Sequence, residues 1–437
     1  MAQRENFGSG LTAMFAMAGS AIGLGNLWRF PYQTGQDGGA AFILIYLIFS
    51  LIISLPILLC ESAIGRSSAS GTFGAMDKLA PGTRWKWLGL LTVFTPMLLL
   101  SYYSVVGGWS VGFFAESLVK GFGADASSRF SVFTSHWWLP LVCHTLFIGT
   151  TALVVSAGVK SGIERFNKIS LPLLFVLIVL IAVYSTSLPG SEEGVRYLLK
   201  PDFGKLSPRV FADAMGQSFF SLSLGVGTIL TYSSYMKKET SLLRAGAGTA
   251  FFDLLFALIA GFAIMPAVFA AGIEPGAGPG LIFETLPFIF GSLGQAAPLL
   301  SRVISVLFFL TIAIAALTSS ISMLEVQAAY LIEEKKFTRG KAVLLVALVT
   351  WALGVLCSLS GKAFSVFDYT VSNFLLPLGA LLFVIFAGWK MPREMFRSEF
   401  IGEGSRKGSG RFFGAFLFMV RYVIPVAILI IFLTNFQ

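Results

Sequence analysis

The chain has little charge and very few cysteines or histidines. Charged residues make up 12% of its 437 residues, against about 25% in an average soluble protein. Neither the three cysteines nor the two histidines show the spacing of a disulfide framework or of a metal motif. The composition therefore argues against a soluble domain, a disulfide-stapled scaffold and a metalloenzyme.

Long apolar stretches fill the chain instead. Hydrophobic residues make up 56% of it, and its mean hydropathy is +0.81. The apolar runs are long and do not alternate with polar residues, which indicates membrane-spanning helices and not a β-barrel. We therefore predict an all-α polytopic membrane protein in a lipid bilayer. It has 11 spans, at about 10–33, 39–65, 87–119, 137–157, 166–187, 209–236, 243–272, 299–332, 342–359, 364–389 and 413–434.

Basic residues concentrate in alternate loops of this pattern. With a cytoplasmic N-terminus the inside loops, together with Arg4, hold most of the 31 Lys and Arg. The outside loops 34–38 and 273–298 hold none. By the positive-inside rule we expect a multi-pass protein of the plasma (inner) membrane with its N-terminus in the cytoplasm. This distribution accounts for the net charge of +9, so we expect no nucleic-acid partner.

Two of the spans are interrupted by glycine and serine. The first interruption is GSAIGLGN at 19–26, and the second is SLSLGVG at 221–227. These residues are poor helix formers, and a break at membrane depth is tolerated only where it lines a cavity or binds something. A single Gly-x-Gly could also be a packing motif. Two of them in corresponding spans point to the binding site of a transporter.

The positions of the two interruptions also suggest an internal repeat. Aligning them superposes spans 1–5 on spans 6–10, and a unit with an odd number of spans repeats with inverted topology. We therefore expect one transporter domain, 1–434, built as a five-plus-five inverted repeat with unwound helices 1 and 6. Repeat one covers about 10–187, repeat two about 209–389, and an extra helix about 413–434. The Pro- and Gly-rich stretch 273–298 is expected to form a structured lid.

The first interruption offers backbone groups for two kinds of ligand. A helix that begins near Leu24 has free amides at a positive dipole end, which suit a carboxylate. A helix that ends near Ile22 has free carbonyls, which suit a hard cation such as sodium. The side-chain oxygen of Asn26 lies close by in sequence. One break could therefore hold an anion and a cation side by side.

Several polar side chains in other spans are further candidates. Asp253 has no cation adjacent in sequence, so a bound cation is its natural partner, and a protonated structural acid is the alternative. The hydroxyls of Thr318 and Ser319 could bind a cation, although small polar residues also join helices. The phenol of Tyr103 could bind a substrate carboxylate or simply pack.

These residues together resemble the neurotransmitter:sodium symporter family. The most specific stretch is GSAIGLGNLWRFP at 19–31. It is supported by 217–235, by GIERF at 162–166, by LTSS at 317–320 and by NFLLP at 373–377. The resemblance covers nearly the whole chain and is strongest to bacterial sodium-coupled amino-acid transporters of the leucine-transporter type. It implies a prokaryotic source, a hydrophobic amino acid as substrate, and a site near the middle of the membrane.

The resemblance implies specific residues at each site. The first of two Na⁺ sites would use Ala21, Asn26, Ser221 and Asp253, and the second would use Gly19, Ile22, Ala315, Thr318 and Ser319. The substrate would contact Ala21, Leu24, Gly25, Leu99, Tyr103, Phe220, Ser221, Ser223, Val226, Ser319 and Met323. An outer gate would pair Arg29 with Asp368, and an inner gate would pair Arg4 with Glu333 near Tyr235.

Residues at four positions refine the expected substrate and ions. Relatives that carry monoamines place an acid at the position of Gly23, so glycine there favours an α-amino acid. No charged side chain is expected in the pocket, and Val226 leaves room for a hydrophobic or aromatic substrate. Ala257 lacks the hydroxyl that chloride-dependent relatives use, and Asp253 provides a fixed negative charge. The resemblance therefore implies no requirement for chloride.

Three other functions compete with sodium-coupled symport by alternating access. A proton-coupled amino-acid carrier of the same repeat class could dispense with Asp253 and with the Thr318–Ser319 pair. A transporter-like receptor would bind substrate without carrying it. An enzyme fits least, because the sequence shows no set of nucleophile, base and orienting group. The oligomeric state cannot be derived from these patterns.

Overall fold

The protein folds almost entirely into helices. The computed structural model describes residues 5–122, 128–273, 281–294, 297–401 and 409–434, and no strand occurs in these ranges. The membrane-spanning segments are α1 (Gly10–Ala21) with η1 (Gly25–Arg29) and α2 (Phe30–Gln36), α3 (Ala40–Phe49) with η2 (Ser50–Ser54) and α4 (Leu55–Ser68), α6 (Lys86–Val119), α8 (Trp138–Ser156), η4 (Val159–Glu164) with α9 (Arg165–Thr186), α11 (Pro208–Ser221) with α12 (Thr228–Ser233), α13 (Leu242–Ala270), α15 (Pro298–Lys335), α16 (Arg339–Leu359), α17 (Gly361–Thr370) with η7 (Val371–Leu375), α18 (Leu376–Ile385) and η8 (Phe386–Lys390), and α20 (Ser409–Phe418) with η9 (Met419–Val423) and α21 (Ile424–Thr434).

The expected number of spans agrees with this arrangement. Nine described helices are long and apolar enough to cross a membrane, and the broken pair of Gly10–Ala21 with Gly25–Gln36, bent by 50°, adds a tenth. The eleventh expected span, 209–236, is α11 and α12, which six residues without regular helix separate. The observed bounds lie close to the expected ones; for example, α8 runs from Trp138 to Ser156 where 137–157 was predicted.

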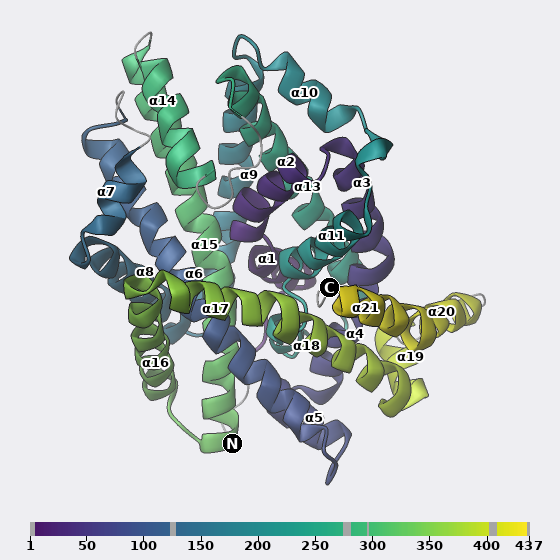
Figure 1. Cartoon of the computed structure of the whole chain (residues 1–437). Helices are drawn as coiled ribbons and strands as arrows, with labels where there is room; N and C mark the ends of the chain where they lie inside the picture. The colour runs from purple at the N-terminus through teal and green to yellow at the C-terminus, as the bar shows by residue number, and fades with distance from the viewer. Residues whose placement is uncertain (1–4, 123–127, 274–280, 295–296, 402–408, 435–437) are drawn as a thin grey trace.

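Short helices connect the spans at both ends. They are α5 (Thr72–Leu79), α7 (Arg129–Ser135), α10 (Glu192–Leu199), η5 (Phe203–Lys205), η6 (Leu281–Thr285), α14 (Leu286–Gly294) and α19 (Arg393–Ile401). In Figure 1, α10 and α14 lie at the top of the molecule and α5 at the opposite end, which we call the base. Of the expected lid, η6 and α14 are helical, whereas 274–280 lies outside the described residues.

Serines at the first positions of several helices help to fix where those helices begin. Ser9 caps α1, its hydroxyl accepting from the amide of Thr12, and Thr12 bonds back to the Ser9 amide in a capping box. Ser207 caps α11 by accepting from the Val210 amide, and Ser241 caps α13 by accepting from the Arg244 amide. Both broken spans therefore start at defined residues, which sets the depth of each interruption.

The first broken helix lies in the middle of the bundle. Figure 1 shows α1 surrounded by other spans, and it packs against α9, α12, α13 and α15. Its last residues, from Ala16 to Ala21, are all buried. The interruption after Ala21 is therefore enclosed by protein, where irregular backbone is tolerated at membrane depth.

Candidate functional site

The first break frees backbone amides, and side chains meet them. After α1 ends at Ala21, Ile22 is extended and the helix resumes at Gly25. The Gly23 amide donates to Asn26 Oδ1 at 3.1 Å, and the Leu24 amide donates to the Tyr103 hydroxyl at 3.0 Å. Both amides have only neutral partners, so a carboxylate could accept from the Leu24 amide and the Tyr103 hydroxyl together.

A cluster of buried oxygens lies beside this break. The amide nitrogen of Asn26 donates to Asp253 Oδ1 at 2.8 Å and to Ser221 Oγ at 3.0 Å. The Ser221 hydroxyl donates to Asp253 Oδ2 at 2.8 Å. All three side chains are fully buried. They come from η1, from the last residue of α11 and from α13, so both breaks and a third span contribute.

Asp253 has hydrogen-bond donors around it but no cationic side chain. Among the described ion pairs none involves Asp253. An ionised carboxylate at this depth is costly unless a positive charge accompanies it. Carboxylate, amide and hydroxyl oxygens are ligands that suit a hard cation. The Asn26–Ser221–Asp253 cluster is therefore chemically suited to hold one.

Two more polar residues extend the cluster. Tyr46 donates its hydroxyl to Ser221 Oγ at 3.1 Å, and Gln217 donates its amide to the Gly25 carbonyl at 2.9 Å. Ala257 is fully buried and carries no donor. The donors that could face an anion here lie next to the Asp253 carboxylate, which repels an anion.

A second group of oxygens gathers where the first break meets α15. Thr318 Oγ1 lies 3.1 Å from the Ile22 carbonyl and 2.8 Å from the Ala315 carbonyl. Ser319 Oγ lies 3.1 Å from the carbonyl of Ser20 and 3.4 Å from that of Ile22. Four of the five residues expected here are thus together. The Ser20 carbonyl joins them, although sequence reasoning had not singled it out.

Gly19, the fifth residue expected in this group, is in contact with α9. A methyl group on Gly19 would collide with Asn167 Oδ1, a buried oxygen that has no hydrogen-bond partner among the described residues. The described contacts show no hydrogen bond between Gly19 and the hydroxyls of Thr318 or Ser319. Close packing of α1 on α9 is therefore what requires glycine at this position.

The second break is shaped differently. Ser223, Gly225 and Gly227 have φ values of +52°, +79° and +76°. The Gly225 amide donates to Glu61 Oε1 of α4 at 2.8 Å, and the Ser223 hydroxyl donates to the Ser20 carbonyl at 2.9 Å. The second break therefore touches the first one directly, and a carboxylate from span 2 fixes its central amide.

A small cavity lies between the two breaks. It is lined by Ala21, Gly23, Gly25, Leu99, Tyr103, Phe220, Ser223, Val226, Ser319, Met323 and Leu376. Nine of the residues expected to contact substrate are in this lining. Leu24 and Ser221 are not in the lining, and Gly23 and Leu376 are additional. No lining side chain carries a charge. A methyl group on Gly23 would collide with Ser319 Oγ and come within 2.6 Å of the Tyr103 hydroxyl, so a side chain here would fill the cavity.

The two residues expected to form the outer gate do not pair in this conformation. The Arg29 guanidinium lies over the ring of Phe220, 5.0 Å from its centroid. Asp368 accepts a hydrogen bond from Ser372 at 3.1 Å. The described ion pairs do not include one between Arg29 and Asp368. Arg29 is therefore joined by a cation–π contact to Phe220, which lines the cavity.

At the base, Tyr235 is bound to a carboxylate that was not expected there. Its hydroxyl donates to Glu325 Oε1 at 2.7 Å, and Arg339 Nη2 donates to Glu325 Oε2 at 2.6 Å. The Phe7 amide donates to the Tyr235 carbonyl at 3.0 Å. Glu333 accepts from the amide of Gly71 at 2.8 Å. Arg4, the expected partner of Glu333, lies outside the described residues.

Sequence reasoning missed Glu325 and Arg339, although a signal was present. Glu325 is a carboxylate within an otherwise apolar run, and such residues are rare and usually functional. Arg339 opens the next span and has its guanidinium beside Glu325. No cluster of three or more His, Cys, Asp or Glu suited to a metal ion occurs among the residues described.

Comparisons with known proteins agree with these observations. The model of the sodium:neurotransmitter symporter family matches residues 4–126 and 126–437. The chain is 36% identical to an uncharacterized sodium-dependent transporter, YhdH, of Bacillus subtilis, covering 96% of this chain and 95% of that one. It is 28% identical to the sodium-dependent serotonin transporter of Drosophila melanogaster, over 88% of this chain and 68% of that one.

A solved structure extends the likeness to the fold. The crystal structure of MhsT in complex with L-phenylalanine aligns with a TM-score of 0.91 and 39% identity, covering 99% of this chain and all of that one. This match confirms the predicted all-α class, a five-plus-five inverted repeat with unwound helices 1 and 6. The family consists of transporters and not of enzymes. The chain belongs to the sodium:neurotransmitter symporter family and is a multi-pass, sodium-dependent symporter.

Proposed function

We propose that this symporter carries a neutral, hydrophobic or aromatic amino acid together with Na⁺ by alternating access, without a requirement for chloride. The observation that supports this most directly is the juxtaposition at the first break. There the Leu24 amide and the Tyr103 hydroxyl lie on one side, and the Asn26–Ser221–Asp253 cluster lies on the other. This arrangement suits an amino acid's carboxylate and a sodium ion at the same time.

The proposed first Na⁺ site couples the ion to the substrate. Asn26, Ser221, Asp253 and the Ala21 carbonyl would supply protein oxygens, and the substrate carboxylate would complete the set. A shared ligand makes each partner bind more tightly when the other is present, which is what coupling requires. The hydrogen bonds now made among Asn26, Ser221 and Asp253 would rearrange to face the ion.

The proposed second Na⁺ site consists of carbonyls and hydroxyls. Ile22 and Ala315 carbonyls already surround the Thr318 hydroxyl, and Ser319 lies beside Ile22. We include the Gly19 carbonyl as well. A tenfold sodium gradient supplies about 1.4 kcal/mol per ion, and 100 mV adds about 2.3 kcal/mol per charge. Two ions would thus supply roughly 7 kcal/mol, enough for about 10⁵-fold accumulation of a substrate without net charge.

The cavity lining supports the proposed substrate class. It has apolar residues, the hydroxyl-bearing residues Tyr103, Ser223 and Ser319, and no charge. Glycine at position 23 leaves space beside Tyr103 and Ser319. The similar protein MhsT was crystallised with L-phenylalanine, so phenylalanine is the first substrate to test. Val226, Leu99 and Met323 would contact its side chain.

We propose independence from chloride because Asp253 supplies a fixed negative charge where a chloride would otherwise lie. Its carboxylate bonds to Ser221, which Tyr46 also contacts. Ala257, one helical turn further along α13, offers no hydroxyl. A second anion at this distance would be repelled, and nothing on Ala257 could hold it.

For topology, we propose a bacterial plasma membrane with the N-terminus in the cytoplasm, so that the base of the molecule faces inward. The concentration of Lys and Arg in the loops of the base supports this orientation. The proposed repeats are 10–187 and 209–389, with 413–434 as an extra helix within a single domain, 1–434.

Uptake into proteoliposomes tests the proposal. Phenylalanine, leucine and glycine are offered as substrates while sodium and chloride gradients are varied separately. We expect uptake of phenylalanine and leucine that requires sodium and is unchanged when gluconate replaces chloride. Uptake that persists without sodium would support a proton-coupled carrier. Binding without uptake would support a receptor.

A further inference from the structure

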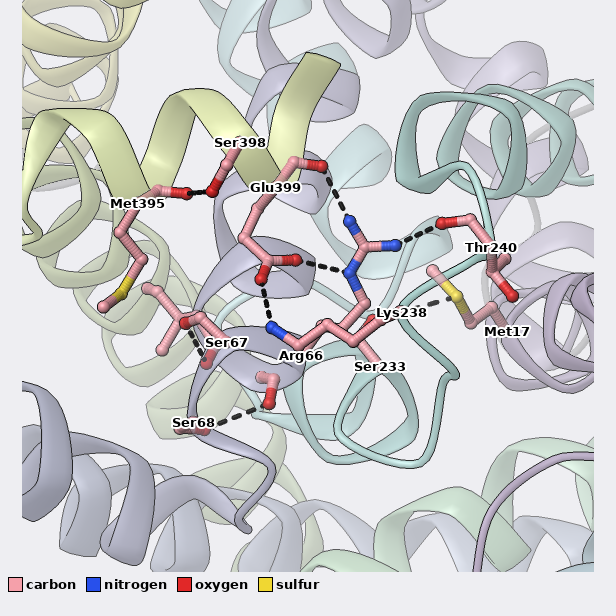
Figure 2. Close-up of polar contacts among 12 residues, drawn as sticks. Met17, Arg66, Ser67, Ser68, Ser233, Lys238, Thr240, Met395, Ser398 and Glu399 are labelled. Carbon is pink, nitrogen blue, oxygen red and sulfur yellow. Dashed lines mark hydrogen bonds and ion pairs between the residues drawn. The ribbon is translucent and has the colours of Figure 1, made fainter. Parts of the chain in front are cut away.

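A buried ion pair joins three segments at the base of the molecule. Arg66, in the last turn of α4, and Glu399, in α19, are 4% and 5% exposed. Arg66 Nε lies 2.5 Å from Glu399 Oε2, and Arg66 Nη2 donates to the Glu399 backbone carbonyl at 2.7 Å. Figure 2 shows the guanidinium between Glu399 and Thr240. The pair thus fixes both the side chain and the backbone of α19.

The same two residues also hold the loop that follows α12. Arg66 Nη1 donates to the carbonyl of Thr240, and Lys238 Nζ lies 2.7 Å from Glu399 Oε1 (Figure 2). Lys238 is 67% exposed, unlike the other two charges. All three guanidinium nitrogens and both carboxylate oxygens therefore have partners. They connect α4, residues 238–240 and α19 at one point.

The loop is short, so its position affects Tyr235. Only two residues separate Tyr235 from Lys238, and at the base Tyr235 bonds to Glu325 and to the Phe7 amide. Further up, α4 is attached to the second break through Glu61 and the Gly225 amide. The span that contains the second break is therefore attached to α4 at two places. Glu61 holds the break itself, and Arg66 holds Thr240, which follows the end of α12.

We propose that Arg66 and Glu399 are positioning residues for alternating access: by fixing α19 to α4 and to residues 238–240, they hold Tyr235 in the closed arrangement at the base. This inference rests on the proposed alternating-access function. Because the pair is buried and fully bonded in this arrangement, it favours the arrangement over one in which the base opens. The exposed Lys238 contact contributes little, as exposed ion pairs generally do.

This role differs from that of a simple structural ion pair. Replacing both buried partners with apolar residues of similar volume commonly preserves stability. Such a change would still remove the bond from Arg66 to Thr240. Stability and the position of Tyr235 can therefore be separated by experiment.

The test measures how often the base opens. Ser233→Cys, on the buried face of α12 beside Met17 (Figure 2), is introduced after Cys60, Cys143 and Cys357 are replaced with alanine. The rate of its modification by a water-soluble methanethiosulfonate is measured in proteoliposomes with and without sodium. In this parent protein we expect sodium to slow the modification. Failure of that expectation counts against the proposed function and not against this inference.

Glu399→Gln is then added to the parent protein. We expect the modification rate in sodium to rise at least fivefold, toward the rate without sodium, and the apparent sodium affinity of uptake to fall. The substrate KM at saturating sodium should stay within twofold. Glu394→Gln is the matched control, because Glu394 lies on the same helix and is 81% exposed. Glu394→Gln should change neither the modification rate nor the apparent sodium affinity of uptake.

A double variant decides the question if Glu399→Gln does not fold. Arg66→Met with Glu399→Met removes both buried charges and should fold, while residues 238–240 remain unattached. A raised modification rate in the folded double variant supports the positioning role. A parental rate in either folded variant, or an equal rise in Glu394→Gln, overturns it.

Discussion

The two interrupted spans lie against each other, and they are built in different ways. In the first, residues 22–24 include none with a positive φ, and the freed amides of Gly23 and Leu24 bond to the side chains of Asn26 and Tyr103. In the second, three of the five residues from Ser223 to Gly227 have a positive φ. There, the backbone of Gly225 also lies close to the backbone of α18.

This difference suggests different roles for the two breaks. Hydrogen bonds from side chains can be exchanged for bonds to a ligand at little cost, since donors and acceptors are simply re-paired. A backbone held by positive φ and tight packing cannot rearrange without strain. The first break is therefore suited to bind ions and the substrate carboxylate. The second is suited to form a firm wall of the cavity.

Removal of the charge at the first break should have the largest effect. Asp253→Asn keeps the shape of the side chain but takes away the only carboxylate in the cluster. We expect sodium-dependent uptake to fall at least 100-fold, or about 3 kcal/mol, as for the loss of one partner from a buried charge pair. Initial uptake rates in proteoliposomes measure this. Asp77→Asn, at an exposed site on α5, is the control. Normal sodium dependence in Asp253→Asn would contradict the proposed site.

A substitution at the second break should lower the stability of the protein. Gly225→Ala places a side chain at a φ of +79° and against the Leu376 carbonyl. We expect a loss of about 2–3 kcal/mol in the free energy of unfolding, from the left-handed conformation and the collision together. Thermal denaturation in detergent measures it. Gly82 also has a positive φ, but nothing lies within 4 Å of an added methyl group. Gly82→Ala should therefore lose only the part of the free energy of unfolding that comes from the left-handed conformation. An unchanged melting temperature in Gly225→Ala would remove the contrast between the breaks.

At the first break, the matching glycine change should affect binding instead. Gly23→Ala adds a methyl group beside Ser319 and Tyr103 without requiring a positive φ. We expect substrate affinity to fall more than tenfold while the melting temperature without substrate changes by only a few degrees. Equilibrium binding of radiolabelled phenylalanine, together with thermal denaturation, separates the two effects. Unchanged affinity would place the substrate elsewhere.

The hydroxyl of Tyr103 should contribute a single charge-assisted hydrogen bond. Tyr103→Phe keeps the ring and removes the group that now accepts from the Leu24 amide. We expect the substrate KM to rise about tenfold, since a hydrogen bond to a charged group contributes roughly 1.5–3 kcal/mol. Tyr102→Phe, on the neighbouring residue, should change KM less, because Tyr102 does not line the cavity.

The smallest effect is expected at the wall formed by the second break. Val226→Leu adds one methylene beside Leu99 and Met323, which would contact the substrate side chain. We expect the ratio of leucine to phenylalanine uptake to change roughly threefold, or about 0.6 kcal/mol, which is below the range of about 1–3 kcal/mol that one methylene can contribute to selectivity. Competition between the two substrates measures the ratio. No change in the ratio would mean that the second break does not form the selective wall.

The long spans and both interruptions could be predicted from the sequence because local composition decides them. An apolar run of about 20 residues has few alternatives to a membrane helix. The small helices α5, α7, α10 and α19 were not predicted, since they are short and their apolar residues alternate with polar ones over only two or three turns. Asn26 and Asp253 could be singled out from the sequence, but their meeting with Ser221 at one site was expected only from family resemblance, since the three come from separate spans.

The sequence alone thus determined the helical membrane class, the depth of the two breaks and the oxygen-bearing residues near them. The tertiary structure decided which of those residues meet. It placed Glu325 against Tyr235, left Arg29 over Phe220 without an ion pair to Asp368, and enclosed Arg66 with Glu399. The spacing along one helix determines which face a residue occupies, but the packing of helices against each other sets which faces come into contact.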